Sequence, residues 1–181
     1  MKSKLFLAFI LFTPILIIVF STLSFNLGYR PADTKNNGTF FKTYFQVPSE
    51  SLVNIKRQAI SFDDGKWVLA HYYLNNNEYE TTLRLMRQLN VALNRDIFRL
   101  KRVLISDDID LDKNIHSKYP NLEIYFDLMN DFKSLLDQNS DQFFNSSKIF
   151  LIDPYGRAVM YFDDELGPKL ILKDLKAVSY T

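Results

Sequence analysis

The sequence predicts an α/β domain that follows a single N-terminal membrane-spanning helix. Residues 5–25 carry no charged side chain, which is typical of a membrane span. After them, short runs of β-favouring residues alternate with segments whose apolar residues recur at helical spacing, as in a sheet covered by helices. The chain of 181 residues is long enough for one such core and an appendage.

The N-terminal apolar run reads LFLAFILFTPILIIVFSTLSF and matches the length of a helix that crosses a roughly 30 Å hydrocarbon layer. A cleaved signal peptide is the competing interpretation, but its apolar run is shorter, and no small-x-small cleavage site follows this one. Lys2 and Lys4 precede the run, so the positive-inside tendency places the N-terminus in the cytoplasm. We expect residues 1–25 to be a retained anchor that enters the lipid bilayer through residues 5–25. Under either interpretation the rest of the chain is exported.

The composition excludes several classes of function. The chain has no cysteine, which excludes disulfides, thiolate metal sites and thiol redox chemistry. Its 22 Lys+Arg residues are interspersed with 21 Asp+Glu residues, so nothing predicts a nucleic-acid partner. Neither a Walker loop nor a G-x-G-x-x-G motif occurs, so we expect no nucleotide partner and predict no cofactor.

Residues 26–59 are interpreted as a linker and an irregular extension. The first part, NLGYRPADTKNNGT, is rich in turn formers, and residues 40–58 mix aromatic and polar residues with a proline. We expect the aromatic residues to pack on the domain or to touch lipid headgroups. The alternative is a contact surface for a membrane partner. These aromatic residues are Phe40, Phe41, Tyr44 and Phe45.

The domain is expected over residues 60–181, and its first elements are legible. Residues 60–62 predict a short strand, and WVLAHYYL, residues 67–74, predicts a central strand covered on both faces. Residues 78–94 carry leucines and a methionine at helical spacing and predict a helix. LKRVLI, residues 100–105, predicts the next strand.

The second half of the domain continues the alternation. Residues 121–126 favour a short strand, and residues 127–138 favour a helix with Asp127 as its N-cap. Residues 148–162 predict a hairpin closed by Pro154-Tyr155-Gly156, and residues 169–178 predict a final amphipathic helix. The resulting order, β-β-α-β-α-β-β-α, is the thioredoxin-like order.

Four stretches carry a resemblance to a known group: GKWVLAHYY, LRLMRQLNVALNRD, RLKRVLI and FLIDPYGRAVMYF. They resemble membrane-anchored, thioredoxin-fold proteins related to the Sco/SenC group, which serves cytochrome c oxidase assembly. The resemblance implies a single-pass protein of the bacterial inner membrane whose C-terminal domain lies in the periplasm. It also implies respiratory oxidase subunits or assembly factors as partners.

The same resemblance locates a degenerate site. The group carries a CxxxC pair and a histidine that together hold copper, and the matching positions here are Asn75, Tyr79 and Asn145. Copper(I) needs sulfur or imidazole ligands, which an amide and a phenol do not replace. We therefore assign no catalytic, cofactor-binding or metal-binding residue.

The remaining candidate residues have ordinary structural interpretations. His71 lies inside the predicted central strand and is expected to be a neutral, hydrogen-bonded imidazole, while His116 is expected on the surface. Residues 108–112 imitate the start of a calcium loop, but Lys113 and Tyr119 replace its essential glycine and glutamate. Six basic residues around the first helix are expected to be solvated, with anionic lipid as the alternative partner. They are Arg84, Arg87, Arg95, Arg99, Lys101 and Arg102.

These observations favour a non-catalytic, membrane-anchored periplasmic binding protein that is an accessory in respiratory complex assembly, and not an enzyme. Two alternatives stay open. One is a metal carrier or an enzyme with non-sulfur ligands, which requires Asn75, Tyr79, His71 and an acidic residue to meet in one pocket. The other is a structural envelope protein unrelated to respiration.

Overall fold

The structure is a computed structural model that describes the backbone of residues 2–26, 36–74, 79–109, 111, 115–146 and 148–179. The chain clusters into two compact units, Met1–Lys35 and Asn36–Thr181. Each unit is described by itself.

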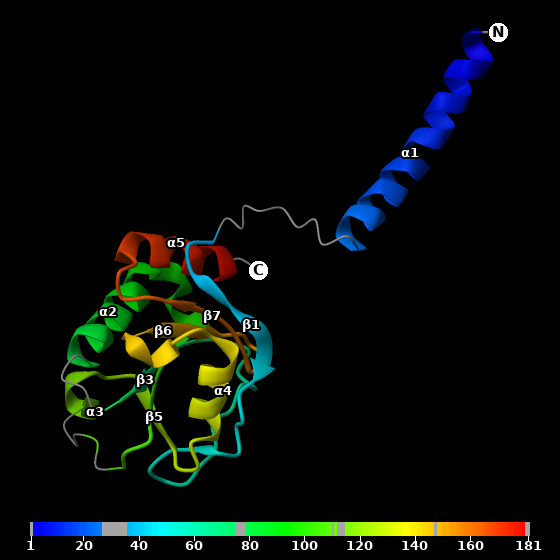
Figure 1. Ribbon diagram of the computed structural model, residues 1–181. Coiled ribbons are helices and arrows are strands. Elements are labelled where there is room, and N and C mark those ends of the chain that lie inside the picture. The colour runs from blue at the N-terminus through cyan, green and yellow to red at the C-terminus, as the bar shows by residue number, and fades with distance from the viewer. Residues whose placement is uncertain are drawn as a thin grey trace. The chain divides into compact units, whose positions relative to one another are not determined.

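The first unit contains helix α1, Lys2–Asn26, with Pro14 inside it (Figure 1). Its described side chains, in residues 10–23, are nearly all apolar and exposed around the helix, as Leu16 and Phe20 illustrate. In the part of the chain whose residues are described, no helix reaches the length and apolarity required to cross a membrane. The side chains of residues 5–9 and 24–25 of the predicted span lie outside the described residues, so the anchor stays a prediction.

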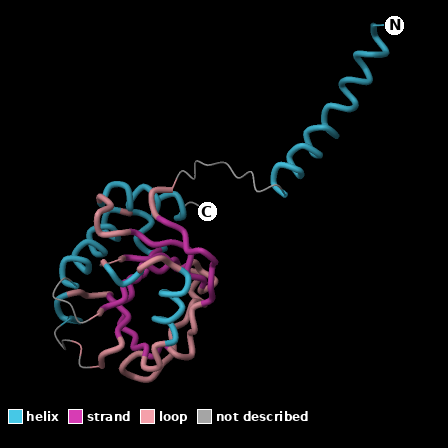
Figure 2. The backbone as a smooth tube through the Cα atoms, viewed as in Figure 1, coloured by secondary structure: helices cyan, strands magenta, loops and turns pink. Residues whose placement is uncertain are grey.

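The second unit is built on a seven-stranded sheet with the order β1-β7-β6-β3-β4-β5-β2. Strands β3, β4 and β5 run parallel, and the other neighbours pair antiparallel. Figure 2 shows the strands as one twisted layer between helices. The strands are β1 Thr39–Gln46, β2 Leu52–Val53, β3 Trp67–Tyr73, β4 Leu100–Ser106, β5 Leu122–Asp127, β6 Ile149–Ile152 and β7 Arg157–Phe162.

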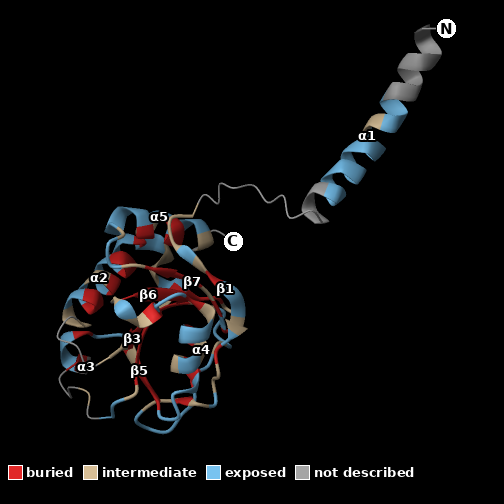
Figure 3. Cartoon of the chain, in the orientation of Figure 1, coloured by how far each residue is buried: buried red, intermediate tan, exposed pale blue. Residues whose placement is uncertain are grey.

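Helices cover both faces of this sheet because alternate residues of each strand point to opposite sides. On one face, α2 and α5 bury Leu83, Met86 and Leu175 in a cluster with Leu104. On the other face, α4 buries Phe132 among aromatic side chains. Figure 3 shows buried residues concentrated on the strands and on the helix surfaces that face them. The helices are α2 Tyr79–Ala92, α3 Ile115–Lys118, α4 Asp131–Asn139 and α5 Pro168–Ser179, and short 3₁₀ turns are η1 Asn94–Arg99 and η2 Phe143–Asn145.

The segment expected to be irregular contributes two strands to this sheet. β1 pairs with β7 and β2 pairs with β5, so the interpretation of residues 40–58 as irregular was wrong. The predicted strand at residues 60–62 is also absent from the described structure, where Ile60 instead donates its N–H to the Leu52 carbonyl. The cause is tertiary pairing: these short edge segments are ordered by strands that lie far away in the sequence.

The aromatic residues of β1 pack on the domain, as expected. Phe41 is buried with its ring centroid 5.2 Å from that of Tyr161, and Phe45 lies 6.1 Å from Phe132. Phe40 packs against the core on the opposite face, whereas Tyr44 is mostly exposed. These rings contribute to the core and leave Tyr44 as the part of the set that solvent or a partner contacts.

The start of the second unit is tied to its last helix. The buried carboxylate of Asp174 on α5 accepts hydrogen bonds from Asn37 N, Asn37 Nδ2 and Gly38 N at 2.7, 2.7 and 2.8 Å. Charge-assisted bonds of this kind are stronger than neutral ones. Asn37 and Gly38, which the sequence placed in a linker, are therefore fixed to the domain.

The other predicted elements agree with the structure, with one shifted helix start. The strands β3, β4, β5, β6 and β7 and the helices α2 and α5 lie where the sequence placed them within a few residues. Asp127, predicted as the N-cap of a helix, is instead the last residue of β5, and α4 begins at Asp131. The Asp127 carboxylate still accepts a hydrogen bond from Lys133 N, in the first turn of α4, at 2.9 Å. The N-cap prediction was wrong, because Asp127 lies at the end of β5 and its side chain extends from there to the first turn of α4.

Candidate functional site

The carboxyl end of β3 is the position where the resemblance locates the sulfur ligands. Tyr79, at the start of α2, is half-buried, and its ring meets that of Tyr73 edge-on, with centroids 5.0 Å apart and planes at 71°. Such aromatic pairs are stabilising beyond their buried area. Asn75 lies outside the described residues. At Tyr79, therefore, an aromatic contact occupies the position where a thiol would act.

Asn145 lies in the 3₁₀ turn η2, where it is exposed. Its side-chain Nδ2 donates to Gln142 Oε1 at 2.9 Å, which is a local contact within the turn. The turn is anchored by Phe143, which is buried against Phe150 and Tyr161. The residue at the histidine position is thus a surface amide on an aromatic-anchored turn.

His71 is 2% exposed in the middle of β3. Its Nδ1 lies 2.9 Å from the Lys148 carbonyl, and because a carbonyl only accepts, Nδ1 carries the proton. Nε2 is buried and has no hydrogen-bond partner among the described residues. Burial lowers the pKa of His71 to about 4, against a smaller opposite effect of the bond to Lys148. The expected role of His71 as a neutral structural imidazole agrees with this geometry.

Lys148 is a buried cation that sequence reasoning missed. Its ammonium donates to the carbonyls of Gln142 and Phe143 at 2.9 and 3.1 Å and lies 3.4 Å from Asp163 Oδ1. It also lies 5.9 Å from the ring centroid of Tyr161. A lysine at the first position of a predicted strand gives no sign of this burial. Here its main-chain carbonyl holds His71 while its side chain holds the η2 turn.

A second buried polar cluster lies where β3 and β5 end. Tyr72 donates its hydroxyl to Asp127 Oδ2 at 3.1 Å, and Asp127 Oδ1 is buried with no partner in the described part of the chain. Burial raises the pKa of Tyr72, and the nearby charges of Asp127 and Asp107 raise it further. Asp107 forms a 2.7 Å ion pair with Lys133. The phenol therefore stays protonated and donates a hydrogen bond from β3 to the end of β5, where Asp127 also accepts from Lys133 N of α4.

The basic residues around α2 are partly engaged within the protein. Lys101 donates to the Ser61 carbonyl at 2.7 Å, and the buried Arg102 donates to the Pro120 carbonyl at 2.7 Å. Arg84 and Arg99 lie near carboxylates on their own helical segments. This arrangement leaves fewer free cations for anionic lipid than the sequence suggested.

Other candidate ligands give no assembled metal site among the described residues. No group of three or more histidine or carboxylate side chains in those ranges lies close enough to hold a metal ion. Asp110 and Asp112 of the calcium-like segment, and the side chain of His116, lie outside the described residues.

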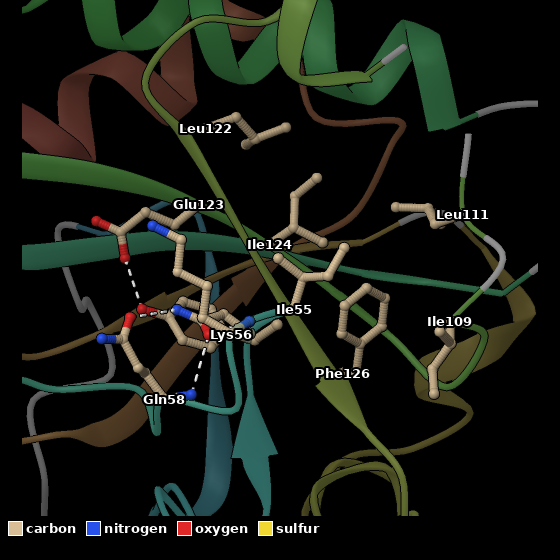
Figure 4. Close-up of a pocket in the computed structure, with 11 residues that line it drawn as sticks. Ile55, Lys56, Gln58, Ile109, Leu111, Leu122, Glu123, Ile124 and Phe126 are labelled. Atoms are coloured by element: carbon tan, nitrogen blue, oxygen red, sulfur yellow. Dashed lines mark hydrogen bonds between the residues drawn. The ribbon is translucent and has the colours of Figure 1, made fainter. Parts of the chain in front are cut away.

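An apolar groove with a volume of about 560 Å³ lies beside β5. Figure 4 shows β5 crossing it, with Lys56 and Gln58 on one side and Ile109 and Leu111 on the other. Sequence reasoning missed this groove because its walls come from three separate segments. They are the loop after β2, the loop after β4, and β5 itself.

Together the sheet order, the helices on both faces and the closing hairpin define an α/β protein of the thioredoxin-like class, in a chain that has no cysteine. The sequence matches the family described as transmembrane-like, thioredoxin-like, C-terminal domain over residues 76–178, more than half of the chain. The chain belongs to this family. No curated protein sequence matches it.

Solved structures similar to this chain include copper-bound Sco1 of yeast, with 15% identity and a TM-score of 0.57, covering 80% of this chain and 92% of that one. Copper-bound ScoI of Arabidopsis thaliana gives 12% identity and a TM-score of 0.55, covering 76% and 96%. The bacterioferritin comigratory protein of Xanthomonas campestris, described for its alkyl peroxide reduction activity, gives 14% and 0.53, covering 76% and 99%. At such identities the likeness establishes the shared fold alone. The prediction of a Sco-related thioredoxin-fold protein is confirmed at that level.

Proposed function

We propose that this chain is a non-catalytic, membrane-anchored binding protein, an accessory in the assembly of cytochrome c oxidase or another respiratory complex. One observation carries the proposal: at the carboxyl end of β3, Tyr79 packs on Tyr73 in a chain without cysteine. Thiol exchange requires a thiolate, which this chain does not supply, and no thiolate is available here as a ligand for a soft metal. Recognition of a partner is the function that this arrangement leaves.

The anchor is part of the proposal. The described apolar side chains of α1 are exposed around the helix, and water is an unfavourable environment for such a surface. Lys2 and Lys4 support an N-terminus in the cytoplasm and, with it, a domain in the bacterial periplasm. Carbonate extraction of membranes tests the anchor: the protein should stay in the pellet, and release to the supernatant contradicts anchoring.

Copper binding tests the non-catalytic part. We expect the full chain in detergent to release Cu(I) to a competing chelator and to leave a test disulfide unreduced. The double variant N75C/Y79C is the matched positive control, because it returns two sulfur ligands at the implied positions. Stoichiometric Cu(I) retained by the unaltered chain contradicts the proposal.

Partner capture tests the assembly role. Crosslinking in intact cells followed by affinity purification should enrich oxidase subunits or their assembly factors, and deletion of the gene should lower oxidase activity. Unchanged oxidase activity together with unrelated partners favours a structural envelope role instead.

A further inference from the structure

The outer edge of β5 is incompletely paired. On its inner side β5 pairs with β4 from Leu122 to Phe126. On its outer side β2 reaches only Phe126 and Asp127, and β5 has no other neighbour in the described sheet. Residues 122–125 therefore border the groove with an edge that no described strand covers.

The hydrogen bonds of β2 show which main-chain groups face this edge. Ile60 N donates to the Leu52 carbonyl at 3.0 Å, and Asn54 N donates to the Gln58 carbonyl at 2.9 Å. Leu52 and Asn54 thus turn toward the returning segment. Because main-chain groups alternate sides along a strand, Val53 turns its N–H and C=O toward β5.

The same alternation applies to β5. Val53 lies opposite Phe126, so Phe126 turns its main-chain groups toward β2. Ile124, two residues earlier, turns its N–H and C=O to the same side, beyond the point where β2 ends. The N–H and C=O of Ile124 therefore face the groove, at a place where a strand that continued the line of β2 would pair with β5.

Apolar side chains flank this edge. Ile55 is 80% exposed and Ile109 is 59% exposed, and both line the groove. Leu122 and Ile124 form its floor. Exposed apolar residues gathered at one concave place mark an interaction site more often than scattered ones do.

The described lining of the groove carries one cation and one carboxylate. Lys56 lines it, and no carboxylate among the described residues lies within ion-pair distance of its ammonium. Glu123, the acidic residue of the lining, accepts a hydrogen bond from the Tyr125 hydroxyl at 3.0 Å. Lys56 is therefore the charged side chain of the lining that has no ion-pair or hydrogen-bond partner among the described residues, and an acidic group on the occupant can pair with it.

We propose that this groove binds an extended, acidic segment of a partner protein, which adds to β5 as an antiparallel strand in line with β2. Its apolar side chains contact Ile55 and Ile109, and an acidic side chain pairs with Lys56. Peptides recognised by strand addition gain affinity from main-chain bonds and specificity from alternate side chains. The inference rests on the proposed binding role and assigns it a surface.

A single acyl chain fits the groove less well than a peptide. It covers the apolar walls, but it buries the N–H and C=O of Ile124 without partners, which is unfavourable. A peptide backbone supplies both a donor and an acceptor at that place. The free edge therefore decides between the two kinds of occupant.

The test uses the full chain in detergent and a short labelled peptide in which valine alternates with threonine and one threonine is glutamate. We expect saturable binding by fluorescence anisotropy. Two derivatives of the peptide are N-methylated on alternate amides. In the first derivative the methyl groups lie along one edge of the extended peptide, and in the second they lie along the opposite edge. One derivative should lose binding and the other should keep it, because only one edge faces β5. Equal binding by both overturns strand addition.

Charge reversal tests the role of Lys56. K56E should weaken binding of the glutamate peptide by about fivefold and strengthen binding of a lysine version, as an exposed ion pair predicts. K173E, on the exposed part of α5, is the matched control and should leave both affinities unchanged. Equal effects of the two variants contradict the site.

The remaining outcomes separate the competing occupants and the two proposals. A bound fraction of peptide that falls as the concentration of full chain rises identifies a second copy as the occupant, and displacement by laurate at a lower concentration than the unlabelled peptide requires identifies an amphiphile. Either result overturns the inference. If K56E loses the peptide but still captures oxidase subunits in cells, the groove assignment fails for that partner and the proposed function stands. If the peptide binds but oxidase subunits are never captured, the proposed function fails and the groove stands.

Discussion

The carboxyl end of β3 and the outer edge of β5 belong to one sheet but differ in how their polar groups are satisfied. At β3, His71 Nδ1 is bonded to Lys148, the Lys148 ammonium is shared between carbonyls, and Tyr79 covers Tyr73. At β5, the main chain of Ile124 faces a groove with exposed apolar walls. At the position that the resemblance implies for a sulfur ligand, Tyr79 makes an aromatic contact, whereas the sheet edge that we propose as a partner site is unpaired among the described strands.

The largest expected effect on stability comes from Phe143→Ala, which removes a buried ring under the η2 turn. Phe143 is buried and contacts Phe41, Phe150 and Tyr161, so its removal leaves a cavity under the η2 turn. We expect the free energy of unfolding to fall by about 3–5 kcal/mol, measured by urea denaturation of the detergent-solubilised chain.

Phe144→Ala is the control for this change. Phe144 is half-buried, with its ring 5.5 Å from that of Tyr72, so its loss should be clearly smaller. Equal losses for the two variants mean that the η2 turn is not anchored through Phe143.

Elements with a clear local pattern were predicted from the sequence, whereas elements that depend on pairing with distant strands were not. Strands β3 and β4 are continuous apolar runs, and α2 shows Leu83, Met86 and Leu89 at helical spacing, so local pattern was sufficient. β1 reads TFFKTYFQ, with aromatic residues at adjacent positions and a bulge between Phe40 and Phe45, so it has no clean alternation. Its strand conformation comes from pairing with β7, which a local pattern does not encode.

The candidate sites divide in the same way. The lack of cysteine was visible in the sequence, including at Tyr79, the position that the resemblance implies for a sulfur ligand, because an absent residue type needs no coordinates. The groove depends on where β2 ends relative to β5, which is a matter of strand register. The burial of Lys148 depends on a turn with Gln142 at positive φ, which long-range packing fixes. These features became visible only with the fold.

A second prediction concerns how His71 in β3 makes the stability of the protein depend on pH. The pKa of His71 is lowered from 6.5 to about 4 in the folded protein, so the unfolded chain binds a proton that the folded chain refuses between these values. Stability is therefore unaffected by this group above pH 6.5 and falls as pH decreases toward 4. The loss approaches about 3 kcal/mol from this residue.

The variant H71L tests this prediction, because leucine does not titrate. Between pH 7 and pH 4, the unfolding free energy of the parent minus that of H71L should fall by up to about 3 kcal/mol. Parallel curves mean that His71 is not the group responsible.

A third, smaller effect isolates the aromatic contact at the implied ligand position. Tyr79→Leu keeps an apolar side chain but removes the edge-on contact with Tyr73, so we expect a loss of about 1 kcal/mol. Tyr44→Leu makes the same change at a mostly exposed position and should stay within about 0.5 kcal/mol of the parent. A Tyr79→Leu variant as stable as the parent contradicts the view that this position is filled by packing.

The smallest expected effect on stability lies at the groove. Ile55→Ser alters a side chain that is 80% exposed, so the free energy of unfolding should change by less than about 0.5 kcal/mol. Affinity for the alternating peptide should nevertheless fall, because Ile55 forms one apolar wall. Ile124→Ser is the informative counterpart, since Ile124 is 9% exposed and belongs to the core cluster, and this change should lower stability and affinity together. Loss of affinity without loss of stability at Ile55 separates a binding wall from a structural one, and an unchanged affinity there removes Ile55 from the binding surface.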